Sequence, residues 1–362
     1  MDYDEKPLLV YWEMTRACDL ACQHCRAEAM PWHHPQELST EEGYDLLDKL
    51  AGFGDPKPHL VLTGGDPLKR PDLFPLISYA KELGFTVAVT PAGTQLITQD
   101  TIQQLREAGA WMLALSLDGS DPKRHDGIRG VPGSFDLTLQ AARWTRSADI
   151  PLQVNTLVCA QTVDDLPEIF ARVSEIGVTQ WALFFLIQVG RGEVLQEVTP
   201  DQSEEVMHWA HEIGQKAAFA IRTTEAPHYR RLVLQQATAQ RREGNPVPNS
   251  EHVRRGFGVR DGSGIMFISH TGEIYPSGFL PIATGRVRDQ DPVEVYRQAP
   301  LFRALRDPDR LKGKCGVCEY RQICGGSRAR AFAATGDPLE SDPLCPYEPV
   351  AETPKPVVGA MP

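Results

Sequence analysis

Seven of the eight cysteines fall into two clusters at opposite ends of the chain. Three lie within eight residues, in the spacing C-x3-C-x2-C: Cys18, Cys22 and Cys25. Four lie in the last fifty residues: Cys315, Cys318, Cys324 and Cys345. The N-terminal stretch MDYDEKPLLVYWE lacks the pattern of a signal peptide, so we expect a cytoplasmic protein with reduced thiols. Clustered reduced cysteines indicate metal ligands rather than disulfides.

The first cluster has one thiolate fewer than a closed metal site requires. Zinc and iron–sulfur sites usually take four protein ligands. A cubane held by three cysteines keeps one iron open to a further ligand, which a catalytic centre needs and a structural centre avoids. Zinc is the alternative, with His24 or His33 as a fourth local ligand. The spacing favours the catalytic cluster.

The second cluster has enough thiolates to close a site. Four cysteines can hold a tetrahedral zinc or a 4Fe-4S cube, and their spacing does not decide between the two. Because the surrounding sequence is poor in regular pattern, we expect a small domain that is fixed mainly by its metal centre. The remaining cysteine, Cys159, stands alone in an apolar stretch and is expected to be a small buried residue.

The elements that must position these residues follow a strand–helix rhythm. Apolar runs predict six strands, at residues 8–12, 60–63, 86–90, 111–117, 152–158 and 181–187. Amphipathic segments predict helices at 41–50, 73–83, 101–108, 135–146, 165–176 and 201–218. Six strands that are each followed by a helix predict a parallel sheet with right-handed crossovers. Near-continuous apolar strands such as WALFFLI suit a sheet that is covered on both faces or curled into a barrel.

The remaining chain suggests a second, smaller unit. Residues 241–264 are rich in Gly, Pro, Asn and Arg and indicate a linker or an ordered loop. The run IMFISHTGEIYPSG predicts a hairpin that turns at Thr271 and Gly272. We therefore expect a barrel over 1–225, a linker or helical connection over 226–264, a cysteine-rich domain over 265–350 and a disordered tail over 351–362.

Composition excludes several classes of function. The 362 residues are 41% hydrophobic and carry a net charge of −11. An acidic chain is a poor partner for nucleic acid or for an anionic membrane, both of which need a basic surface. No apolar run reaches the roughly 18 residues of a spanning helix. We expect no nucleic-acid or membrane partner.

The first cysteine motif, placed after the first strand, resembles that of the radical S-adenosylmethionine (SAM) superfamily. Further motifs follow in the superfamily's order: TGGDP at 63–67, SLDG at 116–119, Arg129-Gly130 and Asn155. The resemblance implies a partial (β/α)6 TIM-like barrel and a 4Fe-4S cluster on Cys18, Cys22 and Cys25. It also implies SAM contacts from Gly64, Gly65, Asp66, Ser116, Asp118, Arg129 and Asn155. Taken singly, these residues have simpler interpretations, such as a helix cap for Asp66 or a surface position for Arg129.

The C-terminal cysteines, preceded by GEIYPSG, resemble the SPASM domain of a large branch of these enzymes. That domain usually carries about seven cysteines and two auxiliary clusters. Here Ser277 stands where the hairpin normally presents a cysteine, and Ser327-Arg328 lacks the extra cysteine after CGG. The resemblance therefore implies one auxiliary 4Fe-4S cluster on Cys315, Cys318, Cys324 and Cys345, with Ser277 as a non-ligand. Structural zinc is the alternative.

The substrate is suggested by the runs HCRAEA, TGGDPLKRPDL and CGGSRARAFAATGD, which resemble the tetrapyrrole branch that includes heme b and heme d1 biosynthesis. This resemblance implies that a 5′-deoxyadenosyl radical abstracts hydrogen from a tetrapyrrole side chain, with decarboxylation of propionates and electrons from a flavodoxin or ferredoxin. Cations on expected loops could meet the propionates: Arg26, Arg191, Arg254, Arg255, Arg260, Arg328 and Arg330.

Two other functions stay open from the sequence. The first is a peptide-modifying maturase, which usually has an N-terminal leader-binding domain; only seven residues precede the first expected strand here. The second is a non-catalytic iron–sulfur protein that relays electrons, although an open three-cysteine site would serve no purpose in a relay. Turnover of SAM separates this second function from the two enzymes.

Overall fold

The computed structural model describes residues 2–244, 253 and 256–350. The expectations for Arg254, Arg255 and the 351–362 tail lie outside these residues. None of the helices in the described ranges is long and apolar enough to span a bilayer.

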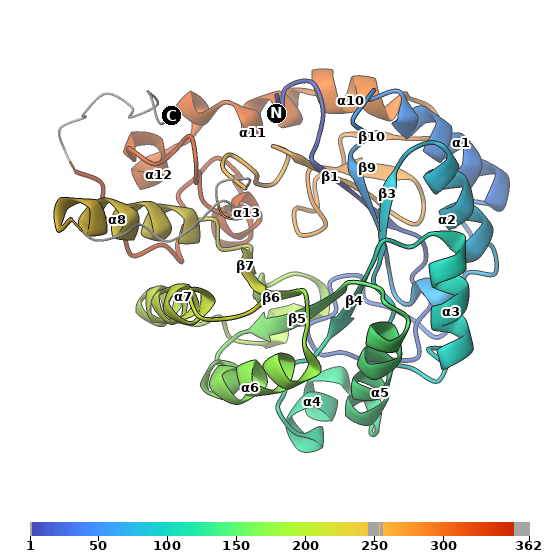
Figure 1. The fold of residues 1–362 in the computed structure, drawn as a ribbon. Helices are drawn as coiled ribbons and strands as arrows, with labels where there is room; N and C mark the ends of the chain where they lie inside the picture. The colour runs from blue at the N-terminus through green and yellow to red at the C-terminus, as the bar shows by residue number, and fades with distance from the viewer. Residues whose placement is uncertain (1, 245–252, 254–255, 351–362) are drawn as a thin grey trace.

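Ten strands form one curved sheet with an open seam (Figure 1). In chain order they are β1 (Leu9–Glu13), β2 (His59–Thr63), β3 (Thr86–Val89), β4 (Met112–Ser116), β5 (Leu152–Val158), β6 (Gln180–Phe185), β7 (Ala220–Thr224), β8 (Ile265–Ile268), β9 (Glu273–Tyr275) and β10 (Gly285–Arg286). Strands β1 to β7 lie side by side in chain order, and all are parallel. The edge strands of the sheet are β7 and β10. The fold is therefore a partial TIM-like barrel.

Helices cover the outside of the curved sheet (Figure 1). The barrel helices are α1 (Thr40–Ala51), α2 (Leu73–Glu82), α3 (Gln99–Ala108), α4 (Pro122–Arg129), α5 (Ser134–Ser147), α6 (Leu166–Ile176), α7 (Pro200–Gly214) and α8 (Tyr229–Arg242). The later helices are α10 (Pro292–Gln298), α11 (Pro300–Arg306), α12 (Gly313–Val317) and α13 (Arg328–Thr335). Local sequence fixes several starts: Ser39 and Glu42 form a capping box at α1, and Thr199 and Gln202 form another at α7.

Alternating strands and amphipathic helices produce one large core. Trp12 and Trp181 are fully buried on β1 and β6, and Leu46, Leu47 and Leu50 of α1 pack into the same cluster. These helical positions are spaced three and four residues apart, so one face of α1 covers the sheet. The apolar core holds the strand ends, and therefore the loops that follow them, in fixed positions.

The structure confirms the six predicted strands and adds a seventh. Strand β7 is missing from the prediction because only Ile221 of its five residues is buried and Arg222 is exposed. The predicted hairpin is present as β8 and β9, which pair antiparallel. Strand β8 also pairs in parallel with β1, so this hairpin extends the barrel sheet. Helix α8 lies in the predicted 226–264 connection, and the domain boundaries stay a prediction.

Candidate active site

The strands of the barrel enclose a central cavity of about 290 Å³, lined by residues of the strands and of the loops after their carboxyl ends. Active sites of TIM-type barrels form at this end of the strands. Nine of the ten residues predicted for the first cluster and for SAM line it: Cys18, Cys22, Cys25, Gly64, Gly65, Ser116, Asp118, Arg129 and Asn155. The structure therefore brings together residues that lie as far as 137 positions apart (155 − 18).

The loop that carries Cys18, Cys22 and Cys25, the three-cysteine site, is held by hydrogen bonds between its backbone and two neighbouring segments. The amides of Ala21 and Gln23 donate to the carbonyls of Arg129 and Ile128, at 3.1 and 2.9 Å. Arg191, in the loop after β6, donates from Nε to the Cys22 carbonyl at 2.9 Å and from Nη1 to the Ala29 carbonyl at 3.0 Å. The end of α4 and the loop after β6 thus fix the path of the cysteine loop.

The glycine pair after β2 supports the start of the same loop. The Gly65 amide donates to the Thr15 carbonyl at 2.7 Å. A Cβ atom at Gly64 would lie 2.4 Å from that carbonyl oxygen, and one at Gly65 would lie 2.4 Å from the Ala17 oxygen. Gly64 also has φ +148°, a backbone conformation that other residues rarely adopt. The pair therefore has a packing role in addition to its exposure to the cavity.

Asp66 does not line the cavity. Its buried carboxylate accepts the Thr94 hydroxyl at 2.9 Å and the Leu68 amide at 3.1 Å, which caps the short 3-10 turn Pro67–Lys69. Burial raises the pKa of Asp66 above its ordinary value. The carboxylate therefore has a structural role in the loop after β2, and its contact with SAM stays a prediction.

Asp118 and Arg129 form a buried ion pair at the cavity wall. Their Oδ2 and Nη2 atoms lie 2.6 Å apart, and Arg129 Nη1 donates to the Cys22 sulfur at 3.6 Å. Asp118 Oδ1 also accepts the Leu157 amide at 2.7 Å. Burial would raise the pKa of Asp118, but Arg129, His24 and His125 together hold it below its ordinary value. Arg129 is therefore not a surface arginine, and its charge faces a cluster ligand.

Ser116 and Asn155 are paired neighbours on β4 and β5. Both line the cavity, and Asn155 Oδ1 accepts the Gln153 amide group at 2.6 Å. Asn155 thus faces inward, which the sequence left open.

The two histidines considered as a fourth zinc ligand lie near carboxylates. Nε2 of His24 lies 3.8 Å from Asp118, and Nδ1 of His33 lies 3.0 Å from Glu37. Three cysteines that open on a cavity instead fit a cluster with one iron that is free of protein ligands.

Two of the predicted arginines line the cavity. Arg26 is paired with buried Glu13 at 2.6 Å and lies over the Phe267 ring at 4.5 Å. Arg191 has a buried Nη2 atom with no hydrogen-bond partner among the described residues. Three others are buried in internal contacts and do not line the cavity: Arg260, Arg328 and Arg330.

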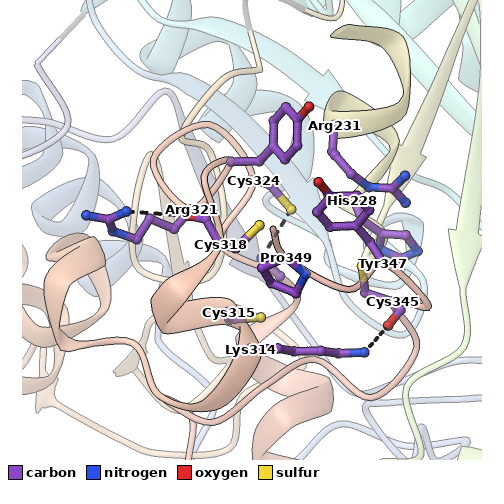
Figure 2. Close-up of a pocket in the computed structure, with 13 residues that line it drawn as sticks. His228, Arg231, Lys314, Cys315, Cys318, Arg321, Cys324, Cys345, Tyr347 and Pro349 are labelled. Carbon is purple, nitrogen blue, oxygen red and sulfur yellow. Dashed lines mark hydrogen bonds between the residues drawn. The ribbon is translucent and has the colours of Figure 1, made fainter. Parts of the chain in front are cut away.

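The four C-terminal cysteines, the four-cysteine site, line one small pocket of about 30 Å³ (Figure 2). Arg231 and Lys314 line the same pocket, and Arg328 Nη2 donates to the Cys315 sulfur at 3.7 Å. The amides of Asp342 and Gly326 donate to the sulfurs of Cys315 and Cys324, each at 3.4 Å. Four thiolates with N–H donors and nearby cations fit an anionic 4Fe-4S cluster.

Cys159 is buried, as predicted, and that Ser277 is not a cluster ligand stays a prediction. Ser277 lines the central cavity instead of the four-cysteine pocket, and its hydroxyl accepts the Phe279 amide at 3.2 Å. Cys159 is fully buried among Ile128, Leu157 and Leu186, with its sulfur 3.5 Å from the Thr162 hydroxyl. Neither lines the four-cysteine pocket.

Comparison with known proteins agrees with this geometry. Residues 12–173 match the model of the Radical SAM superfamily. The chain is 40% identical over 345 residues to the AdoMet-dependent heme synthase of Methanosarcina barkeri (strain Fusaro / DSM 804), covering 95% of this chain and 97% of the relative. The chain belongs to the radical SAM superfamily. It is therefore an enzyme, which excludes the electron-relay alternative.

Two more distant matches are a curated relative and a solved structure. The PqqA peptide cyclase of Bradyrhizobium diazoefficiens (strain JCM 10833 / BCRC 13528 / IAM 13628 / NBRC 14792 / USDA 110) is 28% identical, with 96% of this chain and 88% of the relative covered. The crystal structure of Streptococcus suis SuiB bound to S-adenosylmethionine superposes with a TM-score of 0.71 at 19% identity, over 94% of this chain and 77% of that one. This second match supports the fold.

As a radical SAM enzyme, the protein uses a 4Fe-4S cluster and SAM, and the C-terminal cysteine-rich region fits an auxiliary cluster. Among the cavity residues that the sequence analysis missed, two carry titratable groups. Tyr11 lies inside β1, and Glu225 follows β7. A polar residue directly after a barrel strand is the signal that would have found Glu225, but the strand itself was not predicted.

Proposed function

We propose that this radical SAM enzyme oxidatively decarboxylates propionate side chains of a tetrapyrrole. The observation that carries the proposal is the 40% identity to an AdoMet-dependent heme synthase over almost the whole of both chains. The central cavity supports it, because apolar side chains form much of the wall and few cations interrupt them. A flat macrocycle with carboxylate arms requires this combination.

The chemistry of the proposal balances with one hydrogen atom and one electron per propionate. A side chain –CH2–CH2–COO⁻ becomes –CH=CH2 and CO2 when it loses a hydrogen atom from its first methylene and one electron. The cluster on the three-cysteine site, when bound, supplies the electron that cleaves SAM reductively to the radical that removes the hydrogen atom. The four-cysteine site would hold the acceptor for the electron that the substrate releases.

The chain's own residues bind and orient the two molecules. Gly64 and Gly65 expose backbone to the cavity, while Ser116, Asn155 and the Asp118–Arg129 pair line its wall. We assign these groups to SAM. Nη2 of Arg191, beside the cysteine loop, has no hydrogen-bond partner in the described part of the chain and is suited to a carboxylate of SAM or of the substrate. Glu13 balances the charge of Arg26, whose guanidinium lies over the Phe267 ring at the cavity wall. We assign Arg26 to the substrate.

Three further expectations belong to the same proposal, and they concern the electron donor, the cellular compartment and the domain boundaries. The electron for SAM cleavage would come from a flavodoxin or ferredoxin, and the enzyme would act in the cytoplasm, where its eight thiols stay reduced. The barrel would span 1–225 and the auxiliary-cluster domain 265–350. Arg330 supports a close union of the two parts, since it donates to Glu197 at 2.8 Å and to the Glu225 carbonyl at 2.7 Å.

The test is anaerobic reconstitution followed by turnover. Iron and sulfide are counted per chain, and the enzyme is then given SAM, dithionite and iron-coproporphyrin III. We expect about eight irons, formation of 5′-deoxyadenosine and a porphyrin that loses mass corresponding to two decarboxylated propionates. SAM cleavage with an unchanged porphyrin would contradict the tetrapyrrole assignment and favour a peptide substrate, as the 28% identical peptide cyclase suggests. About four irons with bound zinc would contradict the auxiliary cluster.

A further inference from the structure

Glu225 is an acidic side chain in a cavity whose expected substrate is itself acidic. It follows β7 directly and lines the central cavity together with Tyr11 and Phe267. Its backbone has φ +59°, in the left-handed region that non-glycine residues seldom occupy. Such a conformation persists only where surrounding contacts enforce it, and it marks positions worth testing for function.

The contacts that hold Glu225 come from the C-terminal region. Ser327 Oγ donates to Glu225 Oε2 at 2.5 Å, and Arg330 Nη1 donates to the Glu225 carbonyl at 2.7 Å. Ser327 is the third residue after Cys324 and begins α13 as its N-cap. The carboxyl group is therefore fixed between the cavity and the loop that leaves the four-cysteine site.

The charges around Glu225 oppose its ionisation. Asp261, before β8, and Asp342, beside the four-cysteine site, face it as like charges, while Arg330 partly offsets them. Tyr11 on β1 and Arg230 on α8 also interact with it electrostatically. Burial comes first and Asp261 second in raising the pKa of Glu225 to about 8, against the opposing effect of the Ser327 hydrogen bond. Burial and the two neighbouring carboxylates thus favour the neutral form of the carboxyl group.

We propose that Glu225 is a neutral hydrogen-bond donor to a carboxylate of the substrate, and that it thereby selects substrates whose acidic arm reaches the β7 end of the cavity. A carboxylic acid can donate to a carboxylate in a short, strong hydrogen bond, whereas two carboxylates would repel each other. This inference rests on the proposed function, because it takes the propionates of a tetrapyrrole as the acidic arms. It adds a specificity-determining residue outside the cluster and SAM motifs.

The experiment measures KM for iron-coproporphyrin III and kcat for the reconstituted holoenzyme between pH 6.5 and 9. For the wild type we expect KM to rise above about pH 8, because ionised Glu225 repels the substrate carboxylate. Glu225→Gln stays neutral and retains an N–H donor, so its KM at pH 7 should stay within a few-fold of wild type and lose the alkaline rise. Glu225→Ala should raise KM about tenfold to a hundredfold at pH 7, the range for a hydrogen bond to a charged group.

The matched control is Glu193→Gln, which makes the same chemical change at an exposed residue that does not line the cavity. It should keep the wild-type KM and the wild-type pH profile. An alkaline rise that persists in Glu225→Gln, or an unchanged KM in Glu225→Ala, overturns the proposal for Glu225 while wild-type turnover leaves the proposed function intact. A wild-type enzyme that cleaves SAM but neither binds nor changes the porphyrin overturns the proposed function, and the role of Glu225 with it.

Discussion

The two cysteine sites differ in what they open onto. The three-cysteine site faces a cavity of about 290 Å³, and the four-cysteine site lines a pocket of about 30 Å³. At each site, backbone N–H groups donate to two of the cysteine sulfurs. At the first site Leu20 and Ala29 donate to Cys18 and Cys25, each at 3.4 Å. At the second site Gly326 and Asp342 donate to Cys324 and Cys315, also at 3.4 Å. The sulfurs of the two sites thus accept similar hydrogen bonds, whereas the number of cysteine ligands and the volume of the adjoining space differ.

This difference shows how one chain can divide radical chemistry between two clusters. A site with three ligands next to a cavity can bind a small molecule at its metal, whereas a site with four ligands in a small pocket has no such position. The cationic surroundings are alike, since one arginine donates to a sulfur at each site, Arg129 to Cys22 and Arg328 to Cys315. Because ligand number and adjoining space differ, variants in each site should fail in different ways.

The largest effect is expected at the three-cysteine site. Cys22→Ala leaves two thiolates, too few to hold a cubane with an open iron, so the protein should lose about four irons per chain and make no detectable 5′-deoxyadenosine. Iron analysis and chromatography of the nucleoside products measure both. Cys159→Ala, which removes a buried thiol outside either site, is the control and should keep both. Continued SAM cleavage by Cys22→Ala would refute the assignment.

A different failure is expected at the four-cysteine site. Cys315→Ala removes one ligand of a closed centre and leaves the cavity unchanged, so SAM cleavage should continue at a reduced and uncoupled rate while the oxidised product is lost. The ratio of 5′-deoxyadenosine to product, compared with wild type, measures this. A normal ratio would show that the second site takes no part in the oxidation, and loss of all SAM cleavage would show that the two sites are not separable.

A smaller effect is expected from the buried Asp118–Arg129 pair. Arg129→Met leaves Asp118 buried without its partner, which should lower the free energy of unfolding by about 3–5 kcal/mol. It should also raise KM for SAM about tenfold or more, because the cavity loses a guanidinium that can bind the carboxylate of SAM. Arg172→Met removes an exposed arginine near Glu175 and should change neither quantity. Equal behaviour of the two variants in anaerobic denaturation and SAM titration would remove Arg129 from the site.

The smallest effect is a pH dependence of stability shared by both sites. Burial lowers the pKa of His24, His125 and His228 to about 4, from an ordinary value near 6.5. Between pH 4 and pH 6.5 the unfolded chain binds more protons at these histidines than the folded chain does. Their contribution to the free energy of unfolding is therefore complete above pH 6.5 and is lost as the pH falls toward 4. His228→Asn should make the loss between pH 7 and 5 shallower in anaerobic denaturation. An unchanged slope would mean that His228 is charged in the folded protein.

Much of the fold and of the first site could be predicted because the relevant signals are local. The spacing of Cys18, Cys22 and Cys25 fixes one loop, and the apolar runs around Trp12 and Trp181 mark buried parallel strands. What could not be predicted depends on contacts between distant segments. Strand β7 has one buried side chain and is a strand because β6 pairs with it. Because β7 was not predicted, Glu225 at its end was not recognised either. The conformation of Glu225 depends on contacts with Ser327 and Arg330.

The position of Asp66 shows the same limit within a recognised motif. A glycine pair followed by an acid is readable from the sequence, but the partner of the acid is not. Thr94 and Ala92, in the loop after β3, supply hydroxyl and amide donors to the carboxylate of Asp66, which does not line the cavity. Only the three-dimensional arrangement of those two loops distinguishes a cap from a ligand-binding group.

The parallel pairing of β1 with β8 has a consequence for how the chain matures. Leu9 pairs with Ile265, so one edge of β1 lacks its neighbour until about 250 further residues have been synthesised. At 5–20 residues per second this takes roughly 10–50 s, during which the strand beside the cysteine loop presents unpaired backbone groups. The nascent barrel therefore keeps one edge of β1, the strand that precedes Cys18, Cys22 and Cys25, without its final neighbour for much of translation.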